Sequence, residues 1–158
     1  MITYTHTKPF DGTIEFTNSK DYTIKMDMIA FGKGAKTLVL ISGLSDGLTS
    51  VKGNLLGLWY NYRIFVKDFR ILVISRPDAY TENYSIRDMA DDYYDLLTHL
   101  GITSFSVWGV SMGGMITQSI LVKYPHAVKA ACLDVTSAKT SDAAKNVIDN
   151  WISLAQQN

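Results

Sequence analysis

Cysteine is nearly absent from this chain, and neither sign of charge dominates it. Cys132 is the single cysteine among 158 residues, so no disulfide can form within the chain. Lysine plus arginine and aspartate plus glutamate number 15 each, which leaves no charge excess to attract nucleic acid or an acidic membrane surface. No apolar run approaches membrane-spanning length, and residues 1–9 contain no apolar signal core. These absences predict a cytoplasmic protein with no nucleic-acid and no membrane partner.

Patterns that bind metals or phosphates are also missing. The chain has three histidines, and no group of histidine and cysteine residues has the spacing of a metal site. No glycine-rich loop has the pattern of a phosphate-binding cradle. We therefore expect no metal and no cofactor. Cys132 lies in the apolar run 128–135, which predicts a buried structural thiol rather than a reactive one.

Apolar residues are present in the pattern of a layered domain. At 47% hydrophobic residues, the chain can form one domain with a substantial core. Residues 1–31 predict paired strands with a turn at Asp11-Gly12. Further along, strands are expected over 37–41, 71–75, 105–110 and 128–135, and helices over about 54–69, 85–100, 112–124 and 143–156. This alternation predicts an α/β fold with a doubly wound, mostly parallel sheet.

The segment Gly109-Val-Ser-Met-Gly113 joins a predicted strand to a predicted helix. A serine between two glycines at such a turn is the arrangement that a nucleophilic hydroxyl needs, because the turn strains the serine backbone and directs its oxygen above the sheet. The N-terminus of the following helix offers N–H groups to a developing oxyanion. The alternative interpretation is a glycine-rich turn with an incidental serine.

Together with three other segments, this turn resembles the α/β-hydrolase family. The matching segments are Ile41-Ser-Gly-Leu44, Tyr84-Ser-Ile-Arg-Asp-Met-Ala-Asp-Asp92, Gly109-Val-Ser-Met-Gly-Gly114 and Tyr124-Pro-His-Ala-Val-Lys-Ala130. The resemblance implies that Ser111 is the nucleophile and that the backbone N–H groups of Leu44 and Met112 form the oxyanion hole. Many members carry His-Gly before the oxyanion residue, whereas this chain has Ser42-Gly43, so we expect different hydrogen bonds to hold that loop.

The resemblance also divides the chain into two parts. Residues 1–141 correspond to the N-terminal part of the hydrolase core, which we expect to be truncated after about the sixth strand. Residues 142–158 correspond to the start of a lid or cap helix, and the alternative is a terminal helix packed on the sheet. Because a sheet cut at this point exposes an apolar edge, we expect a homo-oligomer or a complementing C-terminal segment.

A serine hydroxyl needs a general base, and in this family the histidine that serves as base follows the eighth strand. His99 and His126 are predicted near the N-terminal edge of the sheet, roughly 15–20 Å from the edge that carries Ser111. His6 is predicted to lie in a peripheral strand. We therefore expect all three histidines to be surface or structural residues.

Two aspartates lie near the predicted site. Asp134 falls near the end of the sixth strand, where some members of the family carry the acid of the triad. The alternative is a structural aspartate that binds N–H groups of the adjoining loop. Asp46 is predicted to be a turn residue.

The sequence therefore favours a serine hydrolase that acts on an ester or related acyl bond of a small molecule. A serine at this position argues against the dehalogenase and epoxide-hydrolase branches of the fold, which use an aspartate there. Thioesterase, acyltransferase and carbon–carbon hydrolase chemistry stay open. The alternative is a hydrolase-like binding protein without catalysis, or a fragment that needs a complementing chain.

Overall fold

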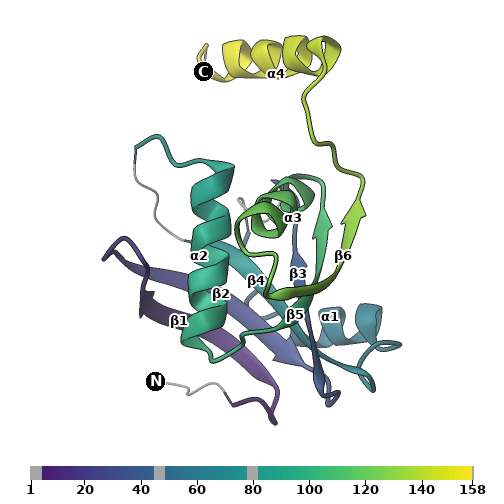
Figure 1. Ribbon diagram of the computed structural model, residues 1–158. Coiled ribbons are helices and arrows are strands. Elements are labelled where there is room, and N and C mark those ends of the chain that lie inside the picture. Colours follow the sequence, from purple (N-terminus) through teal and green to yellow (C-terminus); the bar gives the residue numbers. More distant parts are fainter. Residues whose placement is uncertain (1–4, 45–48, 78–81, 158) are drawn as a thin grey trace.

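The computed structural model describes residues 5–44, 49–77 and 82–157, and within them a mixed sheet forms the centre of the molecule (Figure 1). Its strands lie in the order β1-β2-β4-β3-β5-β6. β1 and β2 form an antiparallel hairpin whose second strand pairs antiparallel with β4, whereas β4, β3, β5 and β6 are parallel to one another. The strand bounds are Phe10–Thr17 (β1), Thr23–Phe31 (β2), Lys36–Ile41 (β3), Phe69–Pro77 (β4), Phe105–Val110 (β5) and Val128–Asp134 (β6).

Helices cover both faces of this sheet, which confirms the predicted doubly wound arrangement. The helix bounds are Leu55–Tyr62 (α1), Ile86–His99 (α2), Met112–Lys123 (α3) and Asp142–Ala155 (α4). α2 and α3 lie side by side on one face and enclose the larger core, while α1 packs on the other face over a smaller apolar cluster. Parallel strands bury both faces, which explains their continuous apolar runs.

Two expectations about the first half of the chain are wrong. Asp11 and Gly12 do not form a turn but lie inside β1, opposite Ile29 and Met28. The hairpin reverses instead over residues 18–22, because the Asn18 side chain accepts hydrogen bonds from the N–H groups of Lys20 and Tyr22. The helix expected over about 54–69 ends at Tyr62, and turns lead from there into β4.

The C-terminal part of the structure corrects one further expectation and excludes one alternative. Cys132 is exposed rather than buried, because β6 lies at the edge of the sheet and most of its residues are open to solvent. α4 does not pack on the sheet: it has no buried residue and stands apart from the body in Figure 1. Its apolar side chains are therefore open to solvent, with Trp151 61% exposed. The interpretation of α4 as the start of a lid stays a prediction.

A capping box holds the start of α2. The Ser85 side chain accepts from the Asp88 N–H, and the Asp88 carboxylate accepts from the Ser85 N–H at 2.8 Å. Lys20 also donates to Asp88, and these hydrogen bonds hold the pKa of the Asp88 carboxyl well below its usual range. The contact between Lys20 and Asp88 ties the helix start to the turn of the β1–β2 hairpin.

We expect Asp88→Asn to lower the free energy of unfolding at pH 7 by about 1 kcal/mol, the typical value of a helix cap. Because the folded pKa of Asp88 lies below the unfolded value, its contribution is present above about pH 4 and is lost as the pH falls further. Urea denaturation of both proteins between pH 7 and pH 2 measures this difference. Asp149→Asn, on the exposed α4, is the control and should have no effect. A difference that does not shrink in acid would contradict the assignment.

Candidate functional site

The turn between β5 and α3 holds a serine in a strained conformation. Ser111 has φ 53° and ψ −118°, a region that residues with a side chain rarely adopt. The Ser111 N–H donates to the Asp134 carbonyl at 2.9 Å, and the Ser111 carbonyl accepts from the Thr136 hydroxyl at 2.7 Å and from the Gly114 N–H at 2.9 Å. The Ser111 residue is exposed to solvent. The neighbouring chain therefore fixes the strained backbone and leaves the hydroxyl accessible.

Close packing explains the glycines on either side of this serine. A Cβ atom on Gly109 would lie 2.2 Å from Oγ1 of Thr117, and one on Gly113 would lie 2.0 Å from the carbonyl oxygen of Ile41. Both distances are far below any normal contact. The glycines thus allow α3 to start against the ends of β5 and β3, as the sequence pattern predicts.

The loop after β3 lies directly beside the serine. A Cβ atom on Gly43 would lie 3.2 Å from the Cβ of Ser111. Leu44 follows in this loop with its side chain 64% exposed, and Met112 is the first residue of α3. The structure therefore brings the predicted nucleophile and the two predicted oxyanion residues to one place, the carboxyl edge of the sheet. Asp46, predicted as a turn residue, lies outside the described residues.

Sequence reasoning missed one residue of this site, Arg76. It lies near the end of β4 and is only 9% exposed. Its Nη2 donates to the carbonyl of Leu44 at 2.9 Å, and its Nη1 lies 3.6 Å from the sulfur of Met112. A signal existed in the sequence, because an arginine that directly extends a buried apolar strand needs polar partners.

Asp134 lies at the carboxyl end of β6, opposite Val110. Its backbone carbonyl is the acceptor for the Ser111 N–H, so the residue is an immediate neighbour of the turn. Burial and, to a smaller extent, the charge of Asp134 raise the pKa of Tyr62, the last residue of α1. Its role as the acid of a triad stays a prediction.

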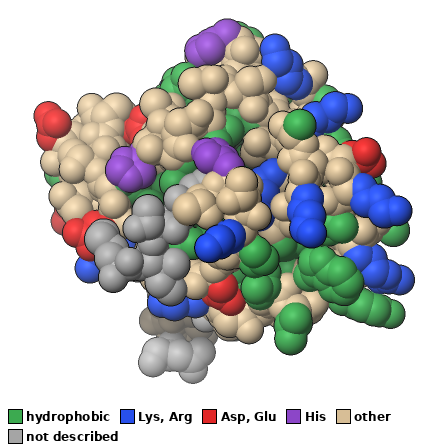
Figure 2. Space-filling model, turned by 90° about the horizontal axis from the view of Figure 1, so that it is seen from below, with side chains coloured by type: hydrophobic (Ala, Val, Ile, Leu, Met, Phe, Trp, Pro, Cys, Tyr) green, Lys and Arg blue, Asp and Glu red, His purple; other side chains and the backbone are tan. Residues whose placement is uncertain are grey.

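The histidines make their contacts at the other edge of the sheet. His6 contacts the carbonyl of Leu100 at 3.3 Å, and it precedes β1 rather than lying in a strand. The His126 Nε2 lies 3.2 Å from the Tyr94 hydroxyl, and the His99 ring lies 5.7 Å from the ring of Phe16. Figure 2, a view from below, shows histidine side chains on the face away from the β5–α3 turn. No described histidine therefore reaches Ser111.

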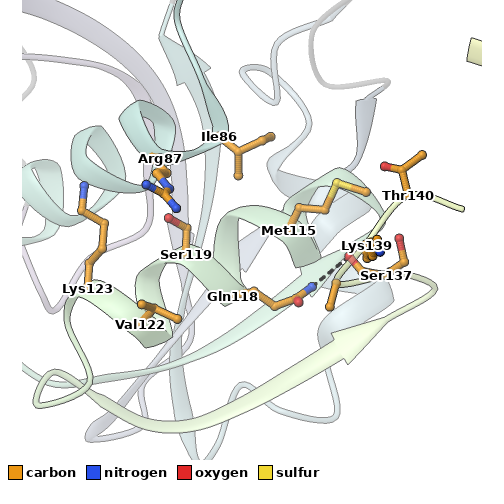
Figure 3. Close-up of a pocket in the computed structure, with 11 residues that line it drawn as sticks. Ile86, Arg87, Met115, Gln118, Ser119, Val122, Lys123, Ser137, Lys139 and Thr140 are labelled. Carbon is orange, nitrogen blue, oxygen red and sulfur yellow. Dashed lines mark hydrogen bonds between the residues drawn. The ribbon is translucent and has the colours of Figure 1, made fainter. Parts of the chain in front are cut away.

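A cavity of about 580 Å³ opens between the start of α2, the outer face of α3 and the segment before α4 (Figure 3). Gln118 spans one side of it and donates to the Ser137 carbonyl at 3.2 Å. Lys123, one of three cationic residues in the lining, is paired with Asp91. Ser111 does not line this cavity, so the cavity does not define a substrate for the turn.

The described residues offer neither a metal site nor a membrane-spanning helix. They contain no group of three histidine, cysteine, aspartate or glutamate residues that could hold a metal ion. No helix in the described ranges is long and apolar enough to cross a membrane. The cytoplasmic location and the absence of a nucleic-acid partner stay predictions.

Comparison with known proteins supports the resemblance. A family model described as the alpha/beta hydrolase fold matches residues 32–157. The chain is 33% identical over 97 residues to RutD of Enterobacter cloacae, which is named as a carbamate hydrolase. The matched region covers 61% of this chain and 36% of RutD. The chain is also 29% identical over 121 residues to epoxide hydrolase 4 of Mus musculus. This match covers 76% of this chain and 34% of that protein.

Solved structures share the fold. A hydrolase from Pseudomonas aeruginosa superposes with a TM-score of 0.72 at 20% identity, over 92% of this chain and 53% of the other. A thermophilic esterase from Thermogutta terrifontis gives 0.70 at 22% identity, over 85% of this chain and 50% of the other. The chain thus spans about a third of the length of the curated relatives and about half of the solved chains.

Proposed function

Because this chain belongs to the α/β-hydrolase fold family, we propose that it carries the nucleophile and the oxyanion hole of a serine hydrolase that cleaves an ester or related acyl bond. The observation that supports this most is the exposed serine held at φ 53° between two close-packed glycines. A protein keeps such backbone strain where function requires it.

In the proposed reaction, the Ser111 Oγ attacks the acyl carbon while a base takes the hydroxyl proton. The N–H groups of Leu44 and Met112 bind the oxyanion of the tetrahedral intermediate. The bond to the leaving group then breaks, and the leaving group receives the proton from the base. A water molecule attacks the resulting acyl-serine by the same route and restores the hydroxyl.

The substrate class proposed is a small molecule with an acyl carbon. The names of a carbamate hydrolase among the relatives and an esterase among the structural neighbours support this, because carbamates and esters both offer a carbonyl to a serine oxygen. An epoxide has no acyl carbon, so we do not carry the activity in the name of epoxide hydrolase 4 over to this chain.

The base must come from elsewhere than the three histidines of this chain, since their contacts lie at the opposite edge of the sheet. We propose that it is supplied by a segment that pairs with the exposed edge strand β6, either in the same polypeptide or in a separate chain. Asp134 at the end of β6 is the acid proposed to orient that base.

The distance of all three histidines from Ser111 also favours a second candidate function. This is a binding protein of the hydrolase fold that performs no chemistry. The oxyanion hole would then bind a ligand without turnover, and binding would not depend on the Ser111 hydroxyl. The two functions differ in whether Ser111 forms a covalent bond.

A fluorophosphonate probe tests the proposal, because it phosphonylates serines that a base activates. Because the base is proposed to come from a segment that pairs with β6, the test uses the full-length protein, or this chain purified together with the partner that supplies that segment. We expect its intact mass to rise by one adduct, with the adduct mapped to Ser111 and absent from Ser111→Ala. Ser119→Ala, on the outer face of α3, should label like the wild type. Absence of any adduct on the wild type would favour the binding protein.

A further inference from the structure

The central strand β4 carries a buried arginine near each end. Arg70 is 4% exposed and Arg76 is 9% exposed. Arg70 donates to the carbonyls of Gly32 and Thr5, each at 3.2 Å, and also to the carbonyl of Lys8, which ties the segment before β1 to the amino edge of the sheet. Arg76 lies at the carboxyl edge, beside the proposed site. The two arginines are therefore similarly buried, but they donate hydrogen bonds at opposite edges of the sheet.

The register of the sheet brings Arg76 to the loop after β3. β3 and β4 run parallel with Ile41 opposite Ile74, so a residue two positions beyond Ile74 lies alongside the start of that loop. The guanidinium then contacts both residues whose N–H groups would bind the oxyanion: it donates to the Leu44 carbonyl at 2.9 Å and approaches the Met112 sulfur at 3.6 Å.

We propose, on the basis of the proposed function, that Arg76 is a positioning residue that fixes the Leu44 N–H relative to the start of α3. A hydrogen bond from a buried guanidinium to a carbonyl is stronger than a neutral one. The carbonyl and the N–H of Leu44 belong to adjacent peptide planes joined at one Cα, so a fixed carbonyl restricts the rotation of the N–H group. Gly43, which has no side chain, cannot supply this restriction itself.

The same contacts explain how a loop with Ser42-Gly43 in place of His-Gly is held. Arg76 reaches it from the neighbouring strand instead of from within the loop. The guanidinium also brings a permanent positive charge next to the proposed oxyanion hole. In a partly desolvated site this charge favours the oxyanion of the transition state over the neutral substrate. Loss of Arg76 should thus reduce the rate of the chemical step more than the affinity for substrate.

Backbone mobility tests the positioning role without requiring any reaction. In ¹⁵N relaxation measurements, we expect the Leu44 amide of the wild type to have an order parameter near 0.85, and Arg76→Met to lower it below about 0.6. Arg76→Lys keeps a charge and a donor and should give an intermediate value. Arg70→Met removes an equally buried arginine and should leave the Leu44 value unchanged. The inference would be overturned if the order parameter of Leu44 did not change in Arg76→Met, or if it fell equally in Arg70→Met. A wild-type order parameter already below about 0.6 would also overturn it.

The rate of phosphonylation tests the consequence for chemistry. We expect Arg76→Met to label Ser111 about 10- to 100-fold more slowly than the wild type, less than the loss of an oxyanion donor itself. Arg76→Lys should recover part of the rate, and Arg70→Met should keep it. If Arg76→Met does not fold, a Lys variant with wild-type rate and wild-type order parameter overturns the proposal. A wild type without any adduct contradicts the proposed function, whereas labelling that is equal in the wild type and Arg76→Met contradicts only the role of Arg76.

Discussion

Ser111→Gly is expected to abolish fluorophosphonate labelling and, at the same time, to raise the free energy of unfolding by about 1 kcal/mol. The φ of 53° and ψ of −118° are strained for serine but accessible to glycine. Relief of strain is worth about 1–3 kcal/mol, and the greater entropy of glycine in the unfolded chain offsets up to about 1 kcal/mol of it. The Ser111 hydroxyl forms no capping hydrogen bond with α3, so its removal costs the fold little.

Two variants separate the chemical effect from the backbone effect. Ser111→Ala removes the hydroxyl but keeps a Cβ, so it should lose labelling without the gain in stability. Ser119→Ala, farther along α3, should change neither property. Chemical denaturation and intact-mass spectrometry of the same protein samples give both results. If Ser111→Gly is still labelled, the nucleophile is another residue; if it is less stable than Ser111→Ala, the strain is not stored at this position.

The turn could be predicted from sequence because all of its signals are local. A short apolar run, a serine between glycines and a following helical pattern lie within residues 105–124, and the strand bounds 105–110 were predicted as observed. The capping box at Ser85 is local in the same sense, since its partners lie three residues apart. The parallel direction of the central strands also follows from alternating strands and helices.

Other features depend on neighbours that are distant in sequence, and there the prediction failed or was silent. Cys132 belongs to an apolar run of the type found in buried strands, but its exposure is decided by the place of β6 at the sheet edge. The contact from Arg76 to Leu44 joins residues 32 positions apart and needs the parallel register of β3 and β4. Asp11-Gly12 is a typical turn signal, yet the side chain of Asn18 provides a better reversal farther along the hairpin.

Gly113→Ala is expected to lower the free energy of unfolding by about 3 kcal/mol or more, although alanine is the better helix former. Gly113 is the second residue of α3 and has no left-handed φ, so in open space the substitution would stabilise the helix by about 1 kcal/mol. The added methyl would instead lie 2.0 Å from the Ile41 carbonyl oxygen and 2.6 Å from that of Ser42. Both are backbone atoms at the end of a central strand, which cannot rotate away as a side chain would.

The sign of the effect therefore distinguishes close packing from helix propensity, and the same displacement should disturb the proposed site. To admit the methyl, α3 must move away from the loop that carries Gly43 and Leu44, so labelling of Ser111 should slow along with the loss of stability. Gly101→Ala is the matched control: Gly101 has φ +74° and nothing within 4 Å of an added Cβ, so it should lose only about 1 kcal/mol and label normally. Guanidinium denaturation and labelling rates measure both variants. Equal or higher stability of Gly113→Ala would mean that α3 and β3 do not meet as closely as described, and the spacing of Ser111 from the proposed oxyanion donors would need to be revised with it.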